Sequence, residues 1–505
     1  MKARRGRVRS HPGPRQARAA GVVAALFAIG VTCGLVAIIA VTFAAPLAGQ
    51  DYTHPKQMDL PAPDFERPDP DNMRVEMANG LAAYVAVDDR APLVTLTAFV
   101  AAGSAHGAPG EAAVVAAALR RGPSHMSAAA FRATLADMAA LYTVTVGREE
   151  TEIVLEVPAE DAWAAMDLLA STLRDPGFGG AGASGAGRTA QAAGIDFATS
   201  LAGATAIFEG RLYQGHPFGR TATGPEMDAA RNGGGERFWR TWFVPRNTVL
   251  AVAGDFQIIE ASARAKEAFE DWTGGDRPDP VDFPSVETAE RQVLTAEAAK
   301  LQGWVVIGHE LPRVPPEDEA ALRVMDYILG AYHLDSRLFR ESRELRGLTN
   351  DNSSFLEAGV RGPGSYSLRT YGRPAVVRLL IDITFRELTK IRTSQPTSDE
   401  LMVAKGALID GLYATRYTTG LDAARNYALE WLRTGSHDAS ASYPDRIAAV
   451  TAVQVQEAAR RYLDPDRMLI AVLGPLAEIS AVPAIETEPP LAAWGRVERV
   501  DQGGR

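Results

Sequence analysis

Two short segments of this 505-residue chain repeat each other at a distance of 220 residues. The first runs from Pro245 to Asp255 and reads PRNTVLAVAGD, and the second runs from Pro465 to Pro475 and reads PDRMLIAVLGP. Each follows a helical stretch that contains aromatic residues, and each is a short apolar strand closed by glycine. Because strands and helices recur in the same order before both segments, the repeat predicts two related α+β halves.

Each half is expected to be a mixed, mainly antiparallel sheet with helices packed on one face. Residues 74–105 predict three short strands, with a hairpin turn at Asn79-Gly80 between the first two. A helix is expected to begin after Ser127, which is a suitable N-cap residue. The stretch Gly177–Gly194 is rich in glycine and is predicted to be a loop, since each glycine costs a helix about 1 kcal/mol.

The first 50 residues predict a segment for export or membrane attachment. Residues 1–18 are rich in arginine, and residues 19–48 are an apolar run without charge, long enough to span a bilayer. A cleaved signal peptide and a single-pass anchor both fit this pattern. In either case the arginines stay in the cytoplasm, so we expect the rest of the chain to be exported, to the periplasm in a bacterium.

Composition excludes several classes of protein. The single cysteine, Cys33, lies in the apolar run, which excludes an internal disulfide, a thiol nucleophile and a cysteine-based zinc site. A net charge of −10 argues against nucleic acid as a partner. The chain also has no G-x-S-x-G, no P-loop and no G-x-G-x-x-G after a predicted strand.

Proline-rich stretches separate the expected parts of the chain. The expected order is a basic cytoplasmic region at 1–18, a signal peptide or anchor at 19–48, a linker at 49–70, an N-terminal domain at 71–275, a linker at 276–290, a C-terminal domain at 291–485 and a tail at 486–505.

Five stretches occur in an order and spacing that match one known family. They are the NGL turn with its strands at 74–105, YQGHPFGRTATGP at 213–225, NTVLAVAGDF at 247–256, DSRLFRESRELRGL at 335–348, and the helix and strand at 447–475. They resemble the insulinase-like (pitrilysin, M16) family of zinc metallopeptidases, which includes the subunits of the mitochondrial processing peptidase. The resemblance covers residues 70–480 and implies two similar domains that close around a polypeptide.

Active members of that family carry H-x-x-E-H, in which two histidines and a downstream glutamate bind zinc and the first glutamate activates water. The family frame aligned on Gly110 and Gly122 places Ala113, Ala116 and Ala117 at the His, Glu and His positions. An alanine methyl group can neither ligate zinc nor move a proton. The resemblance therefore implies a member without catalytic residues and without a metal of its own.

Other residues could replace the missing ligands, but the sequence does not favour any of them. The downstream glutamate is expected near residues 190–195, where Gln191 and Asp196 are the nearby polar groups. His106, Glu111 and His125 flank the alanine-rich helix without sharing one of its faces.

Two further histidines and a short acidic run have structural interpretations. His309-Glu310 begins like H-E-x-x-H, but the prolines that follow forbid a helix, so a strand end is expected. His216 is expected to be structural, and His437 to be isolated. The acidic run of Glu149, Glu150 and Glu152 is expected to be a solvated face rather than a catalytic carboxylate pair.

The family also uses an arginine and a tyrosine of the second half to hold substrate. These positions fall on Arg343 and Asn350, so the arginine is kept and the tyrosine is replaced. The resemblance implies that Arg343 binds a peptide carbonyl or carboxylate. A solvated arginine on a helix explains it equally well.

The sequence thus predicts a non-catalytic homologue that pairs with a zinc-bearing homologue and helps to enclose a polypeptide, with zinc only in the partner chain. A stand-alone protein that binds peptides or supports assembly at the membrane is the alternative. An active zinc metalloendopeptidase with atypical ligands is a third hypothesis.

Overall fold

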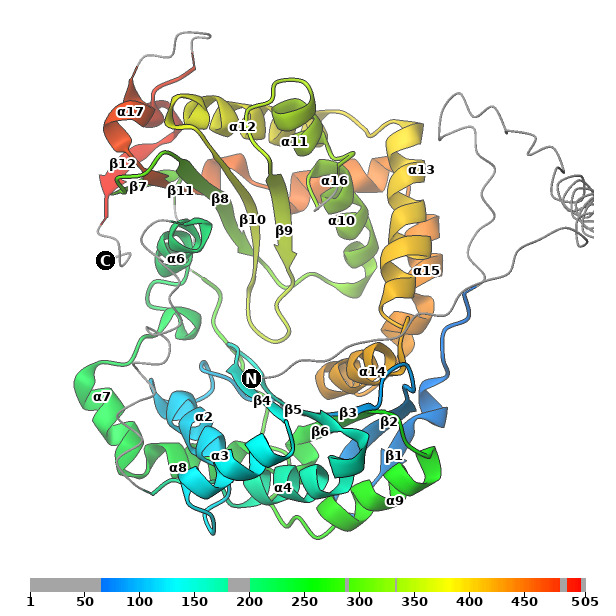
Figure 1. The fold of residues 1–505 in the computed structure, drawn as a ribbon. Coiled ribbons are helices and arrows are strands. Elements are labelled where there is room, and N and C mark those ends of the chain that lie inside the picture. The colour runs from blue at the N-terminus through cyan, green and yellow to red at the C-terminus, as the bar shows by residue number, and fades with distance from the viewer. Residues whose placement is uncertain (1–64, 180–199, 287–289, 332–333, 482–487, 501–505) are drawn as a thin grey trace, which may run out of the picture. The chain divides into compact units, whose positions relative to one another are not determined.

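The computed structural model of the chain describes residues 65–179, 200–286, 290–331, 334–481 and 488–500. It contains two six-stranded mixed sheets, one from each half, with helices around them (Figure 1). The predicted α+β fold with two related halves is confirmed. The expected segments at 1–18 and 19–48 lie outside the described residues, and no described helix is long and apolar enough to cross a membrane.

The first sheet has the strand order β1-β2-β6-β3-β5-β4, in which only β2 and β6 pair in parallel. The predicted turn separates β1 from β2, with Gly80 at a φ of 87° and the Asn79 side chain accepting a hydrogen bond from the Leu81 amide. The strands are β1 (Arg74–Glu76), β2 (Ala82–Val87), β3 (Leu93–Val100), β4 (Leu141–Val146), β5 (Thr151–Pro158) and β6 (Thr248–Gly254).

The second sheet has the order β12-β7-β11-β8-β10-β9, so five of its strands take the places of β2, β6, β3, β5 and β4. The sequence repeat falls on β6 and β11, and a 3₁₀ turn precedes each, at Pro245–Asn247 and Pro465–Arg467. The strands are β7 (Gln292–Glu297), β8 (Gly303–Leu311), β9 (Asn352–Glu357), β10 (Gly364–Gly372), β11 (Leu469–Gly474) and β12 (Arg496–Arg499).

Strand β12 comes from the segment that the sequence assigned to a tail. It pairs in parallel with β7, where Arg496 lies opposite Gln292. Four residues carry too short a pattern to predict a strand, and the pairing partner lies about two hundred positions earlier in the chain.

The helices of the first half pack mainly on one face of its sheet and share a core with it. Ser127 is the N-cap of α3, as predicted, and its hydroxyl accepts a hydrogen bond from the Ala130 amide at 3.1 Å. These helices are α2 (Glu111–Arg121), α3 (Ala128–Asp137), α4 (Ala162–Arg174), α7 (Gly224–Ala229), α8 (Gly235–Trp242) and α9 (Ile258–Phe269).

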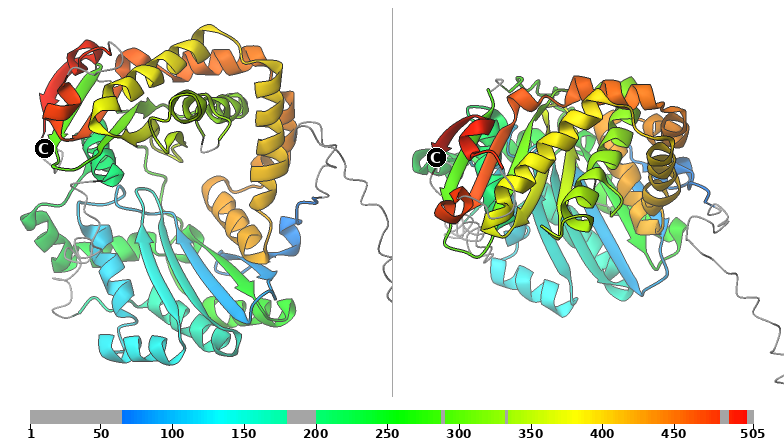
Figure 2. Two further views of the ribbon diagram at one scale, coloured as in Figure 1. Left: turned by 45° about the horizontal axis from the view of Figure 1, so that its top comes forward. Right: turned by 90° about the horizontal axis from the view of Figure 1, so that it is seen from above.

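The helices of the second half surround its own sheet, with α10, α12 and α16 packed on one another (Figure 2). They are α10 (Pro316–Leu329), α11 (Arg337–Phe339), α12 (Val377–Thr393), α13 (Ser398–Gly406), α15 (Asp438–Ala449), α16 (Ala452–Tyr462) and α17 (Leu476–Ser480).

Two helices cross to the other half, which the sequence did not predict. Helix α14 (Gly420–Thr434) packs on β6, β2 and β3, and helix α6 (Leu201–Leu212) packs on β8 and β11 (Figure 1). Every residue of β6 and β11 is therefore buried on both faces of its sheet. The exchange explains why strands β6 and β11 are almost wholly apolar instead of alternating.

Candidate functional site

Helix α2 carries the three alanines that the sequence analysis aligns with the His, Glu and His of H-x-x-E-H. Ala113 is exposed and Ala117 is half-buried, whereas Ala116 is only 2% exposed. The two glycines of the family frame have structural reasons to be there, because both adopt positive φ, with Gly110 before the helix at 93° and Gly122 after it at 91°.

These residues do not fit a zinc ion. Ala113 and Ala117 lie one helical turn apart, as two zinc-binding histidines would, but neither side chain has a lone pair to donate. Across the part of the chain that the structure describes, no group of three or more His, Cys, Asp or Glu could hold a metal. No step of zinc-dependent hydrolysis can be assigned to these side chains.

His106 serves the fold beside α2. Its Nδ1 accepts a hydrogen bond from the Gly103 amide at 3.1 Å, and its ring packs edge-on against Trp242 and Phe283. Burial, together with the nearby positive charge of Arg361, lowers the pKa of His106 to about 4. The imidazole is therefore neutral near pH 7.

The other residues considered as replacement ligands do not converge on His106. Glu111 accepts a hydrogen bond from the Ala108 amide at 3.1 Å and lies 3.8 Å from Arg237, while His125 is exposed. Gln191 and Asp196 lie outside the described residues.

Two other histidines hold loops and strands together. His309 lies near the end of β8, as predicted, and its Nε2 accepts a hydrogen bond from the Asp464 amide at 3.3 Å. His216 is buried, with Nδ1 accepting from the Phe218 amide at 3.1 Å and Nε2 lying 2.9 Å from the Pro284 carbonyl. Both contacts of His216 agree with a structural role.

The two residues at the family's substrate-binding positions contact each other. Arg343 Nη1 donates hydrogen bonds to the side-chain oxygen of Asn350 at 2.9 Å and to its carbonyl at 3.2 Å. Both residues are exposed, and the guanidinium also lies 5.4 Å from the ring centre of Phe339. Asn350 therefore orients Arg343, although it replaces a tyrosine.

The acidic residues after β4 do not form a solvated face, so that prediction was wrong. The half-buried Glu149 carboxylate accepts three backbone hydrogen bonds from the loop between β9 and β10. The donors are the amides of Val360 at 3.1 Å, Arg361 at 2.8 Å and Gly362 at 3.0 Å. These donors lie 211 to 213 residues from Glu149 in the sequence, so no local pattern could indicate the contact.

Its two acidic neighbours contact helix α14. Glu150 forms a two-point ion pair with Arg433, with N–O distances of 2.6 and 2.7 Å. Glu152 pairs with Arg425, which also donates a hydrogen bond to the Thr97 hydroxyl at 3.0 Å. We call Glu149, Glu150 and Glu152 the acidic turn; it joins the first half to the second.

A cavity of about 530 Å³ lies beside the acidic turn. Arg148 is part of its wall, where it pairs with Glu209 at 2.8 Å and lies over the Tyr213 ring at 4.5 Å. Phe99 and Asn426 also line the cavity, which therefore combines apolar and charged surface. Cavities of this volume and mixed lining are typical of ligand sites.

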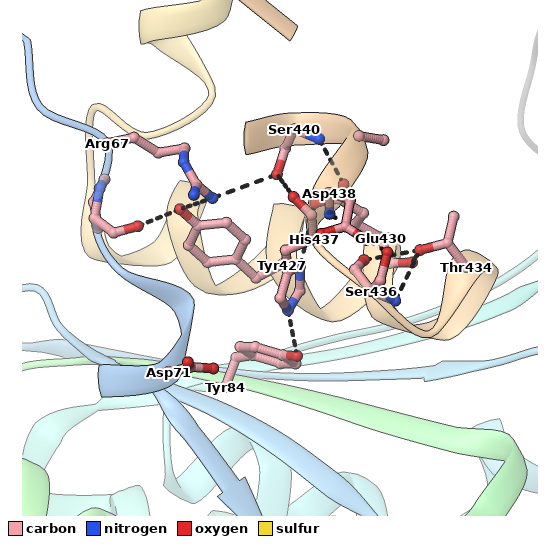
Figure 3. A network of polar contacts seen from close by, with 12 residues as sticks. Arg67, Asp71, Tyr84, Tyr427, Glu430, Thr434, Ser436, His437, Asp438 and Ser440 are labelled. Atoms are coloured by element: carbon pink, nitrogen blue, oxygen red, sulfur yellow. Dashed lines mark hydrogen bonds and ion pairs between the residues drawn. The ribbon is translucent and has the colours of Figure 1, made fainter. Parts of the chain in front are cut away.

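His437, expected to be isolated, also joins the two halves (Figure 3). Its Nε2 lies 2.7 Å from the Tyr84 hydroxyl of β2, and its Nδ1 lies 3.3 Å from Glu430 of α14. Burial raises the pKa of Tyr84 far above its usual range, so its hydroxyl stays a neutral donor.

Sequence reasoning missed Arg425, Arg433 and the loop at 360–362 as members of this region. The only local signal is the glycine-rich stretch EAGVRGPG at 357–364, which predicts a tight turn but no partner. The two arginines look like ordinary residues of an amphipathic helix.

Comparisons with known proteins agree with this architecture. The family described as Peptidase M16 inactive domain matches residues 236–408, about a third of the chain. No curated protein matches the chain in sequence.

Three solved structures share the fold. A peptidase M16 inactive domain from Pseudomonas fluorescens has a TM-score of 0.67 at 20% identity, over 83% of this chain and 99% of that one. A protease from Helicobacter pylori has a TM-score of 0.68 at 16% identity, over 80% and 99%. A chain of complex III2 from Candida albicans, bound to Inz-5, has a TM-score of 0.60 at 15% identity, over 80% and 96%.

Sequence identities of 15–20% to these structures establish the fold alone. The match of residues 236–408 to the family is the evidence from sequence. In the alignment of the sequence analysis, alanines stand at the His, Glu and His positions, and an alanine side chain can neither ligate zinc nor activate water. The match of residues 236–408 to the peptidase M16 inactive domain and the shared fold support a degenerate insulinase-like homologue, a pseudopeptidase in which alanines stand at the aligned H-x-x-E-H positions.

Proposed function

We propose that this pseudopeptidase is the non-catalytic partner of a zinc-bearing homologue, and that the two chains enclose a polypeptide outside the cytoplasm. The observation that carries the proposal is helix α2, which lies between the two glycines of the family frame and carries alanine at the aligned His, Glu and His positions. A wall that holds polypeptide needs the fold but not the metal.

Two further observations support a role in holding peptide. Arg343 remains exposed and is oriented by Asn350, so its guanidinium can bind a carbonyl or carboxylate of a peptide. The Candida albicans relative of the same fold belongs to an assembly, complex III2, which is a precedent for this architecture in a multi-subunit protein.

The first test is copurification. The tagged full-length chain would be extracted from its own host in mild detergent, and the chains that accompany it identified by mass spectrometry. The proposal requires a chain with H-x-x-E-H at a ratio of about one to one, and zinc bound to the pair but not to the pseudopeptidase alone. Zinc bound to the isolated pseudopeptidase would instead support the atypical metallopeptidase.

The second test concerns Arg343 in the isolated pair. Replacing Arg343 with alanine should raise the KM for peptide about tenfold, since one charge-assisted hydrogen bond is lost, without dissociating the pair. Arg340→Ala is the matched control, because Arg340 is exposed on the same helical segment. An equal change in KM for the two variants would show that Arg343 does not bind the peptide.

Export is tested separately. Added protease should degrade residues 51–505 in spheroplasts with an intact inner membrane, whereas a cytoplasmic marker should survive. Protection of the chain would contradict the proposed location. If the chain is exported but carries no zinc-bearing partner, the stand-alone peptide-binding protein becomes the better explanation.

A further inference from the structure

The loop between β9 and β10 has the geometry of an anion site. The amides of Val360, Arg361 and Gly362 are consecutive, and all three donate to the carboxylate of Glu149. Successive backbone N–H groups that converge in this way form a concave site that prefers anions. The three groups that converge on Glu149 are all donors, so this position favours a negatively charged group.

The loop is folded tightly on itself and does not depend on Glu149 alone for its shape. A Cβ atom at Gly359 would lie 1.9 Å from the carbonyl oxygen of Gly362, and one at Gly364 would lie 2.1 Å from that of Glu357. A Cβ at Gly362 itself would meet the ring of Phe218 at 2.3 Å. Such close approaches indicate a preformed loop that would keep its three donors in place without Glu149.

The cavity of about 530 Å³ gives a ligand access to this loop, because Glu149 and Val360 both line it. Glu149 also lines a smaller pocket, together with Glu150, Arg361 and Arg433, so two arginines lie near the site. The ion pair of Glu150 with Arg433 and that of Glu152 with Arg425 would hold the acidic turn if Glu149 alone rotated away.

We propose that the loop at 360–362 is a carboxylate-binding site that Glu149 occupies as an internal ligand, and that a carboxylate entering the cavity exchanges with it. The exchange loosens the contact between the acidic turn and the β9–β10 hairpin. The carboxylate belongs either to the C-terminus of a polypeptide, which rests on the proposed function, or to a small free acid.

The first experiment vacates the site. Glu149→Ala in the full-length chain, purified in detergent, should lower the melting temperature by about 2–4 °C. Acetate should restore at least half of this loss in a saturable way, because it places a carboxylate back on the three amides. Chloride at equal ionic strength and neutral acetamide should not.

Glu160→Ala is the matched control, since Glu160 is an exposed glutamate of the same half. It reports the general effect of acetate on the protein. An acetate response of Glu149→Ala no larger than that of Glu160→Ala would overturn the proposal, because the vacated loop would then bind no carboxylate.

The second experiment identifies the source of the carboxylate. The peptide acetyl-Ala-Ala-Ala is titrated into Glu149→Ala with a free C-terminal carboxylate or as the amide. Binding at least tenfold tighter for the free acid supports a polypeptide C-terminus. Equal binding of acid and amide, with acetate still effective, overturns the polypeptide source and leaves the carboxylate site standing. The acetate result does not depend on a partner chain, so it is separate from failure of the proposed function.

Discussion

The hydroxyl of Tyr84 lies 2.7 Å from Nε2 of His437, although 353 residues separate them in the chain. With Nδ1 facing Glu430, the imidazole has a hydroxyl donor on one side and a carboxylate acceptor on the other. Tyr84 is fully buried, so this hydrogen bond links β2 to the second half away from solvent.

Removing the Tyr84 hydroxyl should therefore weaken the contact between halves. Tyr84→Phe leaves the imidazole nitrogen buried without a donor, and should lower the free energy of unfolding by about 1–2 kcal/mol in urea titrations. Its effect should not add to that of His437→Ala, because both break the same bond. Tyr142→Phe, which loses a hydrogen bond to Leu119 within the first half, should add.

The ion pair between Glu150 and Arg433 should make a small contribution that depends on salt. Their side chains are 19% and 38% exposed, so solvent screens the pair, and a double-mutant cycle should give a coupling of about 0.5–1 kcal/mol. The more exposed pair of Glu236 with Arg240 should give about 0.3 kcal/mol. Equal coupling in both pairs would contradict a special role for the acidic turn.

His106 should make the fold sensitive to acid. Its pKa is about 4 in the folded chain and near 6.5 when unfolded, so between these values only the unfolded state takes up the proton. Stability from this group is complete above pH 6.5 and falls as the pH drops toward 4, by about 2 kcal/mol after solvent screening.

The measurement is urea unfolding of the native chain and of His106→Gln from pH 7.5 to 4. The glutamine side-chain oxygen can accept the hydrogen bond from the Gly103 amide, and glutamine does not titrate. The difference between the two curves should grow below pH 6.5. Parallel curves would show that His106 is not held neutral.

Gly122 should not tolerate a side chain. Its φ is 91°, and an added Cβ would lie 2.3 Å from Cγ of Phe131, so Gly122→Ala should cost about 3 kcal/mol or more. Gly215 also has a positive φ, of 78°, but has no atom within 4 Å of the added Cβ. Gly215→Ala should cost only about 1–2 kcal/mol, from backbone strain. Thermal unfolding measures both costs: Gly215→Ala reports backbone strain alone, and the additional loss in Gly122→Ala reports the steric clash with Phe131.

Among the substitutions that would restore H-x-x-E-H, the one that introduces the glutamate should cost the most stability. Ala113 is exposed, so Ala113→His should change stability by less than about 0.5 kcal/mol. Ala116 is 2% exposed, and Ala116→Glu should cost about 2–4 kcal/mol because it buries a carboxyl group. If Ala116→Glu left stability unchanged, helix α2 would still face open space suited to the lost motif.

Several features of the fold followed from local sequence patterns. The turn at Asn79-Gly80, the cap at Ser127 and the strands β6 and β11 of the sequence repeat were all predicted correctly. Turn, cap and strand patterns depend on residues a few positions apart, which sequence shows directly. The four-residue strand β12 was missed because its pairing with β7 is not local.

At the candidate site, the sequence predicted only which metal-binding side chains are missing from helix α2. Ala113, Ala116 and Ala117 cannot themselves bind zinc or move a proton, because a methyl group has no lone pair. The roles of Glu149 and His437 were misjudged, because their partners lie in the other half of the chain.

The sequence by itself determined the two related α+β halves and the alanine side chains of helix α2, since repeat, periodicity and side-chain chemistry are local properties. Only the tertiary structure decided that α14 and α6 each cover the other half's sheet, and that the acidic turn binds a distant loop. Packing between surfaces sets these contacts, and an apolar helix face or a carboxylate fits many partners until the whole chain has folded.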